Sequence, residues 1–185
     1  MRILIIGKTG QLGEELYVQG KDLKHKVTAF SHDELDITDS KNLEKTIKKV
    51  RPDIVMNAVA YHVVADCEIY PDKAFLVNAI AVRNVAEITE EMNIPFITYS
   101  TDYVFDGKKG SLYTEYDRPT PVQTYGVSKV AGEYMALAYN SSSIVIRSSG
   151  VYGGKFGSRS KKGNFALNIL KEKNRKTLEV SSEQI

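Results

Sequence analysis

Short apolar runs alternate along this chain with longer stretches in which apolar residues recur every three or four positions. The runs have the composition of strands buried on both faces, and the stretches have the period of amphipathic helices. The predicted strands cover residues 2–6, 26–30, 54–56, 94–99 and 143–147, and the predicted helices cover 11–20, 39–50, 71–92, 122–139 and 164–173. This alternation implies right-handed crossovers and an α/β fold with a doubly wound parallel sheet.

The helix predicted at residues 39–50 shows its pattern clearly. Leu43 and Ile47 fall on one side of it, and lysines fall on the other. Thr38 or Asp39 could cap its first turn.

The composition excludes several function classes. Lys and Arg total 25 against 23 for Asp and Glu, and the formal net charge of +2 gives no basic footprint for nucleic acid. No apolar run is long enough to span a bilayer, and a single cysteine, Cys67, cannot form an internal disulfide. No metal is expected, because His25, His32 and His62 lie in separate loops. We expect a cytoplasmic protein that binds neither nucleic acid nor membrane.

The first predicted strand runs directly into a glycine-rich turn, Gly7-Lys-Thr-Gly-Gln-Leu-Gly13, and a helix follows. Gly7 allows the tight turn, Gly10 lets backbone approach a pyrophosphate, and Gly13 lets the helix pack closely on the strand. The N–H groups and the positive end of the helix dipole then face the phosphates. This context predicts a Rossmann-like dinucleotide site, with Gln11 and Leu12 also among the cofactor-binding residues.

The end of the second strand bears on the choice between NADPH and NADH. An acidic residue there would bind the ribose 2′-hydroxyl and repel a 2′-phosphate, but neither Ser31 nor His32 is acidic. Because Lys8 adds a cation nearby, the sequence favours NADPH, although Lys8 and His32 are equally consistent with solvated loop residues. We expect Ser31 to contact the cofactor.

Two further segments are candidates for cofactor contacts. Asp36 and Ile37 precede a helix and could bind and pack against the adenine, or Asp36 could merely cap its turn. Ala58, Val59 and Ala60 follow the third strand, and their small size suits backbone that passes close to the second ribose of the cofactor.

A tyrosine and a lysine four residues apart provide candidate chemistry. Tyr125 and Lys129 project from the same face of the helix predicted at 122–139. A tyrosine hydroxyl with a pKa near ~10 is a poor proton donor, and a nearby ammonium and an oxidised nicotinamide would lower that pKa. Thr101, which follows the fourth strand, could hold the same carbonyl oxygen. Together they predict carbonyl reduction.

At these positions the chain resembles the extended short-chain dehydrogenase/reductase family, and within it the dTDP-4-dehydrorhamnose reductase group. The resemblance covers nearly the whole chain. Besides the glycine turn, it is carried by Arg51-Pro-Asp53, Asn57-Ala-Val-Ala60, Asn78-Ala79, Ser100-Thr-Asp-Tyr-Val-Phe105, Tyr125-Gly-x-Ser-Lys129, Gly132-Glu133 and Arg147-Ser-Ser149. The stretch that begins at Ser100 is far more specific than the glycine turn.

The resemblance implies an enzyme that transfers hydride from NADPH or NADH to C4 of a nucleotide-linked 4-keto-6-deoxysugar. In that enzyme Tyr125 would protonate the new alkoxide, and Lys129 would lower the pKa of Tyr125 and hold the nicotinamide ribose. Thr101 would bind the 4-oxo group, and Asp102 would line the sugar pocket. Tyr99 is a further expected cofactor contact, and a homodimer is compatible with the resemblance.

Two features depart from the pattern of this group. Gly150 stands where relatives carry a tryptophan, which removes an aromatic surface from the expected sugar pocket. The family also continues well beyond the helix predicted at 164–173, into helices that cap the sugar nucleotide. We therefore expect a dinucleotide-binding Rossmann domain over residues 1–150 and, over 151–185, the start of a truncated or minimal substrate-binding lobe.

Two other functions stay open. A dinucleotide-binding regulatory subunit without its own turnover, like that of methionine adenosyltransferase, would share the glycine turn, but intact Thr101, Tyr125 and Lys129 argue against it. A nucleotide-sugar epimerase or dehydratase of the same fold is a third possibility. Dehydration is disfavoured because no Asp-Glu pair follows Thr101.

Overall fold

The structure, a computed structural model, describes residues 1–151, 169–175 and 177. Its sheet has five parallel strands in the order β2-β1-β3-β4-β5. The strands are β1 (Arg2–Ile6), β2 (Lys26–Phe30), β3 (Ile54–Asn57), β4 (Phe96–Thr101) and β5 (Ile144–Ser148). The strand order reverses between β1 and β3, and ligands of open α/β sheets bind at such a switch point, beyond the carboxyl ends of the strands.

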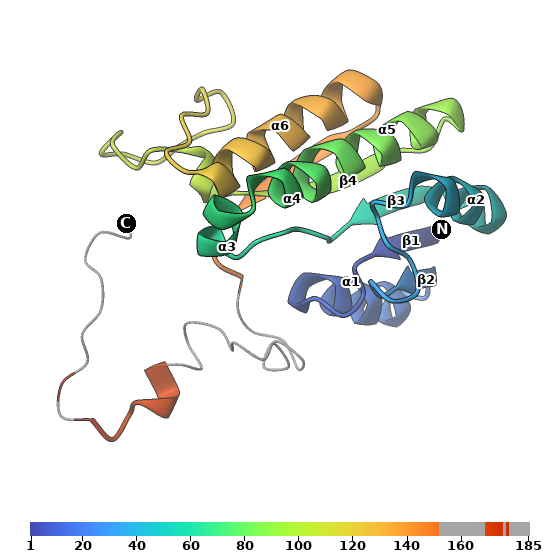
Figure 1. Ribbon diagram of the computed structural model, residues 1–185. Helices are drawn as coiled ribbons and strands as arrows, with labels where there is room; N and C mark the ends of the chain where they lie inside the picture. Colours follow the sequence, from blue (N-terminus) through green and yellow to red (C-terminus); the bar gives the residue numbers. More distant parts are fainter. Residues whose placement is uncertain (152–168, 176, 178–185) are drawn as a thin grey trace.

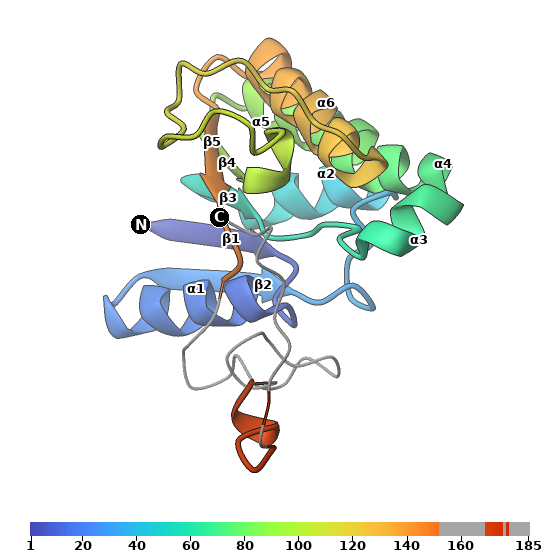
Figure 2. The same ribbon diagram turned by 90° about the vertical axis from the view of Figure 1, so that its left-hand side faces the viewer.

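Helices lie on both sides of this sheet (Figures 1 and 2). They are α1 (Gln11–Asp22), α2 (Ser40–Val50), α3 (Val64–Ile69), α4 (Pro71–Phe75), the π-helical turn η1 (Leu76–Ile80), α5 (Ala81–Glu91), the 3₁₀ turn η2 (Asp102–Val104) and α6 (Thr124–Tyr139). α1 lies on one side, and α2, α5 and α6 lie on the other (Figures 1 and 2). The doubly wound parallel fold predicted from the sequence is thus confirmed.

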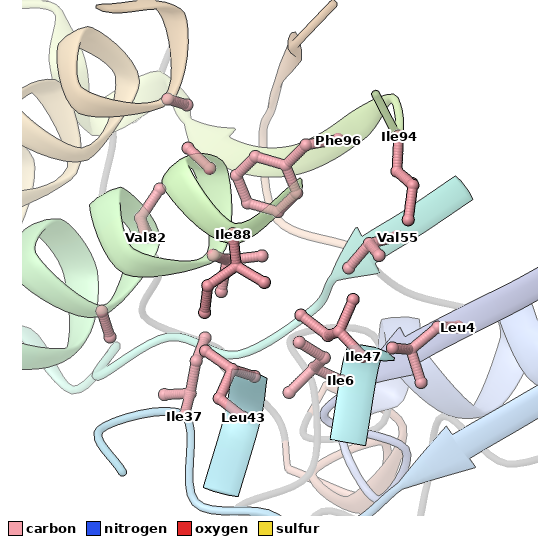
Figure 3. Packing of buried hydrophobic residues seen from close by; sticks show 14 of the residues in the cluster. Leu4, Ile6, Ile37, Leu43, Ile47, Val55, Val82, Ile88, Ile94 and Phe96 are labelled. Atoms are coloured by element: carbon pink, nitrogen blue, oxygen red, sulfur yellow. The ribbon is translucent and has the colours of Figure 1, made fainter. Parts of the chain in front are cut away.

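The main core fills the space between the sheet and α2 and α5 (Figure 3). Leu4 and Ile6 alternate along β1 towards this side, where Leu43 of α2 and Val82 of α5 meet them. All four side chains are at most 1% exposed, as is Phe96 of β4. Complete burial of a side chain of this size stabilises the fold by roughly 1.5–3 kcal/mol, so these contacts fix the strands that carry the site.

Several element boundaries differ from the sequence prediction. β4 begins at Phe96 instead of residue 94, because Asn93 adopts a left-handed φ of 54° and the N–H of Ile94 still bonds to the Thr89 carbonyl after α5. The helix predicted at 71–92 is interrupted by the π-helical turn η1, and α3 was not predicted. The helix predicted at 164–173 lies partly outside the described residues, within which 169–171 are helical.

The cap of α2 is also settled. The Asp39 carboxylate accepts a hydrogen bond from the N–H of Asn42 at 3.1 Å, as expected of a capping residue. Thr38 is engaged elsewhere, because its N–H and hydroxyl both donate to Asp36.

α1 packs against the end of β1 through direct backbone contact. A Cβ placed on Gly13 would lie 2.1 Å from the carbonyl oxygen of Gly7, closer than any side chain permits. A Cβ placed on Gly10 would meet nothing nearer than 3.5 Å, an ordinary contact. These two glycines of the turn therefore have different roles: the close packing of α1 requires Gly13 and does not require Gly10.

We expect Gly13→Ala to lower the free energy of unfolding by about 1–3 kcal/mol or more, because backbone must move to admit the methyl group. Gly10→Ala is the matched control and should unfold at nearly the wild-type urea concentration. Urea denaturation followed by circular dichroism measures both. Equal midpoints for the two variants would contradict this account of the packing.

Candidate functional site

The glycine turn is held against the end of β2. The N–H groups of Gly7 and Lys8 both donate to the carbonyl oxygen of Phe30, at 2.9 Å each. α1 then starts behind Gly10, an N-cap without a side-chain hydrogen bond to the first turn. Uncapped N–H groups and the positive end of the helix dipole suit an anion such as a pyrophosphate.

The segment after β3 forms a second wall beside this turn. The N–H of Ala58 donates to the Ile6 carbonyl oxygen at 2.9 Å, and the buried Asn57 amide oxygen accepts from the N–H of Val59 at 2.9 Å. A Cβ on Gly7 would lie 2.9 Å from a methyl group of Val59. The structure thus brings together the turn and two of the predicted cofactor residues, Ala58 and Val59, with Ala60 following them.

The end of β2 contains an acid that sequence reasoning missed. The N–H and hydroxyl of Ser31 both donate to one carboxylate oxygen of Glu34, at 2.8 and 3.0 Å. The sequence places no acid at Ser31 or His32 and the first one at Asp33, yet it is Glu34 that reaches Ser31. Glu34 is brought back by a turn, in which the N–H of Leu35 bonds to the Ser31 carbonyl.

Asp36 and Ile37 are engaged within the protein. One Asp36 oxygen accepts from the N–H and hydroxyl of Thr38 at 2.8 and 2.7 Å, and these bonds hold the pKa of Asp36 below its usual value. Ile37 is 2% exposed and belongs to the hydrophobic core. The turn-capping role of Asp36 is therefore present, and contacts of either residue with adenine stay a prediction.

The three candidate catalytic residues come from β4 and α6. Thr101 ends β4, and Tyr125 and Lys129 lie one turn apart near the start of α6. A Cβ on Gly126 would lie 2.2 Å from the carbonyl oxygen of Tyr103, so α6 sits directly on the backbone that follows Thr101. The rings of Tyr103 and Tyr125 meet edge to face, with centroids 5.8 Å apart.

Burial shifts the protonation of both α6 residues. It raises the pKa of Tyr125, and a hydrogen bond with the Thr101 hydroxyl opposes that rise. The Lys129 ammonium is buried and donates to the Tyr99 carbonyl oxygen at 2.6 Å. Burial lowers the pKa of Lys129 to about 8, against the charge of Glu133, which raises it. The pKa of Tyr125 is therefore raised in the protein alone, and the lowering expected from the sequence would also require the oxidised nicotinamide.

Two residues that sequence reasoning did not assign to the site fix the position of α6. The buried Asn78 amide donates to the Tyr61 carbonyl at 2.9 Å and to the Ser128 hydroxyl at 3.0 Å. The Glu68 carboxylate accepts from the N–H and hydroxyl of Thr124, at 2.7 Å each. Asn78 could be noticed only as part of the family pattern, and Glu68 lies on α3, which the sequence did not predict.

A partly buried ion pair joins α6 to β5. Arg147 donates two hydrogen bonds to Glu133, at 2.9 and 2.6 Å, and its guanidinium lies 5.2 Å from the ring centroid of Phe105. Gly150, a few residues beyond, is exposed, and a Cβ there would meet nothing within 4 Å. The position at which the resemblance leads us to expect a tryptophan is thus open to solvent.

The remaining predicted residues lie around this edge of the sheet. Asp102 is exposed and accepts a hydrogen bond from the Thr101 hydroxyl at 3.0 Å. The Gln11 amide donates to the Val151 carbonyl at 2.7 Å, and Leu12 follows in the first turn of α1.

The described part of the chain has neither a membrane-spanning helix nor a metal-binding cluster. No helix in this part of the chain has the length and apolarity needed to cross a membrane. Within the same residues, no group of three or more His, Cys, Asp or Glu side chains could hold a metal ion.

The chain is similar in sequence to several reductases. It is 35% identical to dTDP-4-dehydrorhamnose reductase of Escherichia coli over 100% of this chain and 61% of the relative. It is also 35% identical to a probable low-salt glycan biosynthesis reductase, Agl14, of Haloferax volcanii, over 84% of this chain and 55% of the relative. The crystal structure of Bacillus anthracis dTDP-4-dehydrorhamnose reductase in complex with NADP superposes with a TM-score of 0.86 at 32% identity, over 94% of this chain and 61% of that one.

These matches have a limited span, since the chain covers about 55–61% of the length of these relatives. The family profile described as the RmlD substrate binding domain nevertheless matches residues 1–185. With the strand order and the strand-end residues described above, this match shows that the chain belongs to the RmlD family of the extended short-chain dehydrogenases/reductases.

Proposed function

We propose that this chain is the dinucleotide-binding part of an NAD(P)H-dependent reductase that acts on a nucleotide-linked 4-keto-6-deoxysugar. One observation carries the proposal: Thr101, Tyr125 and Lys129 lie close together beyond the carboxyl ends of the strands. The uncapped start of α1 lies at the same edge of the sheet. The reductases among its relatives, and the NADP in one of their crystal structures, support it.

The residues present fit a dinucleotide. The N–H groups at the start of α1 would hold the pyrophosphate, and the space beside Gly10 would admit it. Lys129 would hold the nicotinamide ribose, and Ala58 and Val59 would line the path between the two ends. When bound, NADPH supplies the hydride for the reduction.

The chain itself would supply the proton. The Tyr125 hydroxyl would donate it to the substrate oxygen at C4. The Thr101 hydroxyl, which donates to Asp102 in this structure, would turn to donate a hydrogen bond to the same oxygen. Burial raises the pKa of Tyr125, so the hydroxyl keeps its proton at neutral pH. The Lys129 ammonium would stabilise the phenolate that remains. Asp102, which is exposed beside Thr101, would face the sugar.

We expect Tyr125→Phe to lower turnover by roughly 10²–10⁴-fold, the usual cost of losing a positioned proton donor, while NADPH still binds. Tyr134→Phe is the matched control, because Tyr134 lies on the same helix and is 61% exposed. Turnover is measured with a panel of nucleotide 4-keto-6-deoxysugars from the loss of NADPH absorbance. Wild-type turnover in Tyr125→Phe would contradict the assignment. A chain that binds NADPH but reduces no member of the panel would favour a dinucleotide-binding regulatory subunit.

The affinity for NADPH should fall as the pH rises through about 8, because the Lys129 ammonium that holds the ribose is lost there. Glu133→Gln removes the charge that raises this pKa, so the fall should move to lower pH. Glu87→Gln, which alters a half-exposed carboxylate paired with Arg83, is the control and should keep the wild-type profile. Fluorescence titration with NADPH across the pH range measures the effect. An affinity unchanged on either side of pH 8 would remove Lys129 from the cofactor site.

Gly10→Val should abolish dinucleotide binding and leave the fold intact. Gly10 has extended backbone (φ −75°, ψ 157°) that valine adopts readily, and its Cβ would make only ordinary contacts. The valine side chain would, however, occupy the expected pyrophosphate position. Calorimetry with NADPH and a urea melt test the two halves of this prediction. Tight binding by a folded Gly10→Val variant would refute the proposed cofactor site.

A further inference from the structure

The end of β2 carries a carboxylate whose position bears on cofactor choice. The Glu34 side chain folds back so that one of its oxygens accepts from both donors of Ser31, the backbone N–H at 2.8 Å and the hydroxyl at 3.0 Å. We propose that Glu34 sets the balance between NADPH and NADH by occupying the two Ser31 donors that a ribose 2′-phosphate would use. This inference rests on the dinucleotide site of the proposed function.

Ser31 is placed where the adenine ribose would lie. It follows Phe30, whose carbonyl oxygen holds the N–H groups of Gly7 and Lys8. These two hydrogen bonds hold the start of the segment after β2, including Ser31, beside the glycine turn. The ribose 2′ position of a dinucleotide is recognised at this strand end.

The two cofactors would meet Glu34 differently. A 2′-hydroxyl is a donor as well as an acceptor, so it can donate to the Glu34 carboxylate while Ser31 stays engaged. A 2′-phosphate has only acceptor oxygens in its ionised form, so it needs the Ser31 N–H and hydroxyl for itself and is repelled by the carboxylate. The phosphate can enter only if the Glu34 side chain leaves.

The surroundings permit that exchange. Glu34 is exposed, so its side chain can turn into solvent without losing packing. The hydrogen bonds from Ser31, followed by the charge of Lys8, hold the pKa of Glu34 below its usual value, so the carboxylate is ionised at neutral pH. The Lys8 ammonium lies over the Tyr17 ring, 4.9 Å from its centroid. Its positive charge would attract either the Glu34 carboxylate or a 2′-phosphate. Glu34 and a 2′-phosphate are thus competitors for one set of donors.

The test compares the dissociation constants of NADPH and NADH for the chain and its Glu34→Gln variant. The enhancement of nicotinamide fluorescence on binding reports each dissociation constant. The glutamine can still accept from the 2′-hydroxyl, but its neutral amide oxygen is a weaker competitor for the two Ser31 donors and does not repel the phosphate. We expect the ratio of the two constants to move about tenfold towards NADPH, mainly through tighter NADPH binding.

Asp33→Asn is the matched control. It removes one negative charge from the neighbouring exposed residue, and Asp33 makes no hydrogen bond to Ser31 among those identified in the described residues. We expect it to move the ratio much less than Glu34→Gln. An equal shift in both variants would overturn the proposal, because general charge would then explain the effect.

A double variant tests the role of the donors. Ser31→Ala removes the hydroxyl, so in the Glu34→Gln background it should reverse part of the gain in NADPH affinity while changing NADH affinity little. A ratio unchanged in Glu34→Gln, or moved towards NADH, would overturn the proposal, as would failure of either nucleotide to bind the unaltered chain. Because these titrations need no sugar, a shifted ratio together with no turnover of the sugar panel would sustain this inference and reject the proposed reductase.

Discussion

The site depends on two places at which backbone touches backbone. The start of α1 rests on Gly7, where a Cβ at Gly13 would be 2.1 Å from a carbonyl oxygen, and the start of α6 rests on Tyr103, where a Cβ at Gly126 would be 2.2 Å from another. These contacts leave no room for side chains between helix and strand end. They bring the uncapped N–H groups of α1 and the hydroxyl of Tyr125 to the same edge of the sheet. Under the proposed function, this one edge would serve both the cofactor phosphates and the reacting carbonyl.

Buried polar groups complete this positioning. Asn78 lies in the π-helical turn η1 and ties the chain after β3 to α6 through Tyr61 and Ser128. Such bonds gain little net energy when made but cost heavily when one partner is lost, so they favour a single arrangement of the three segments. Lys129 follows the same logic, since its buried ammonium has the Tyr99 carbonyl as partner. Burial is also what lowers the pKa of Lys129, so the contacts that fix this lysine tune its chemistry.

The repeating apolar pattern predicted the five strands and their parallel order of connection because each strand is short, bounded by polar residues and followed by a periodic helix. It could not predict where β4 begins, since that depends on the left-handed turn at Asn93. α3 escaped notice because six residues are too few for a helical period to show. Spacing and the ends of elements were enough to propose Tyr125, Lys129 and Thr101 as candidates. Glu68 and Asn78, in contrast, act through contacts with residues 17 to 56 positions away. Long-range partners of this kind leave no local signal in a sequence.

The acidic residues after β2 show why a residue's position in the sequence does not establish whether its side chain can contact a cofactor. Asp36 could contact adenine by its place in the chain, but one of its oxygens already accepts two hydrogen bonds from Thr38. Glu34 lies four residues beyond the last residue of the strand, yet its carboxylate reaches Ser31 because the intervening residues turn back. Each carboxylate is governed by the donors within its reach, and a cofactor must compete with those donors or displace them. On the proposed role of Glu34, the choice between a 2′-hydroxyl and a 2′-phosphate would be decided by hydrogen bonds that form only when the chain is folded.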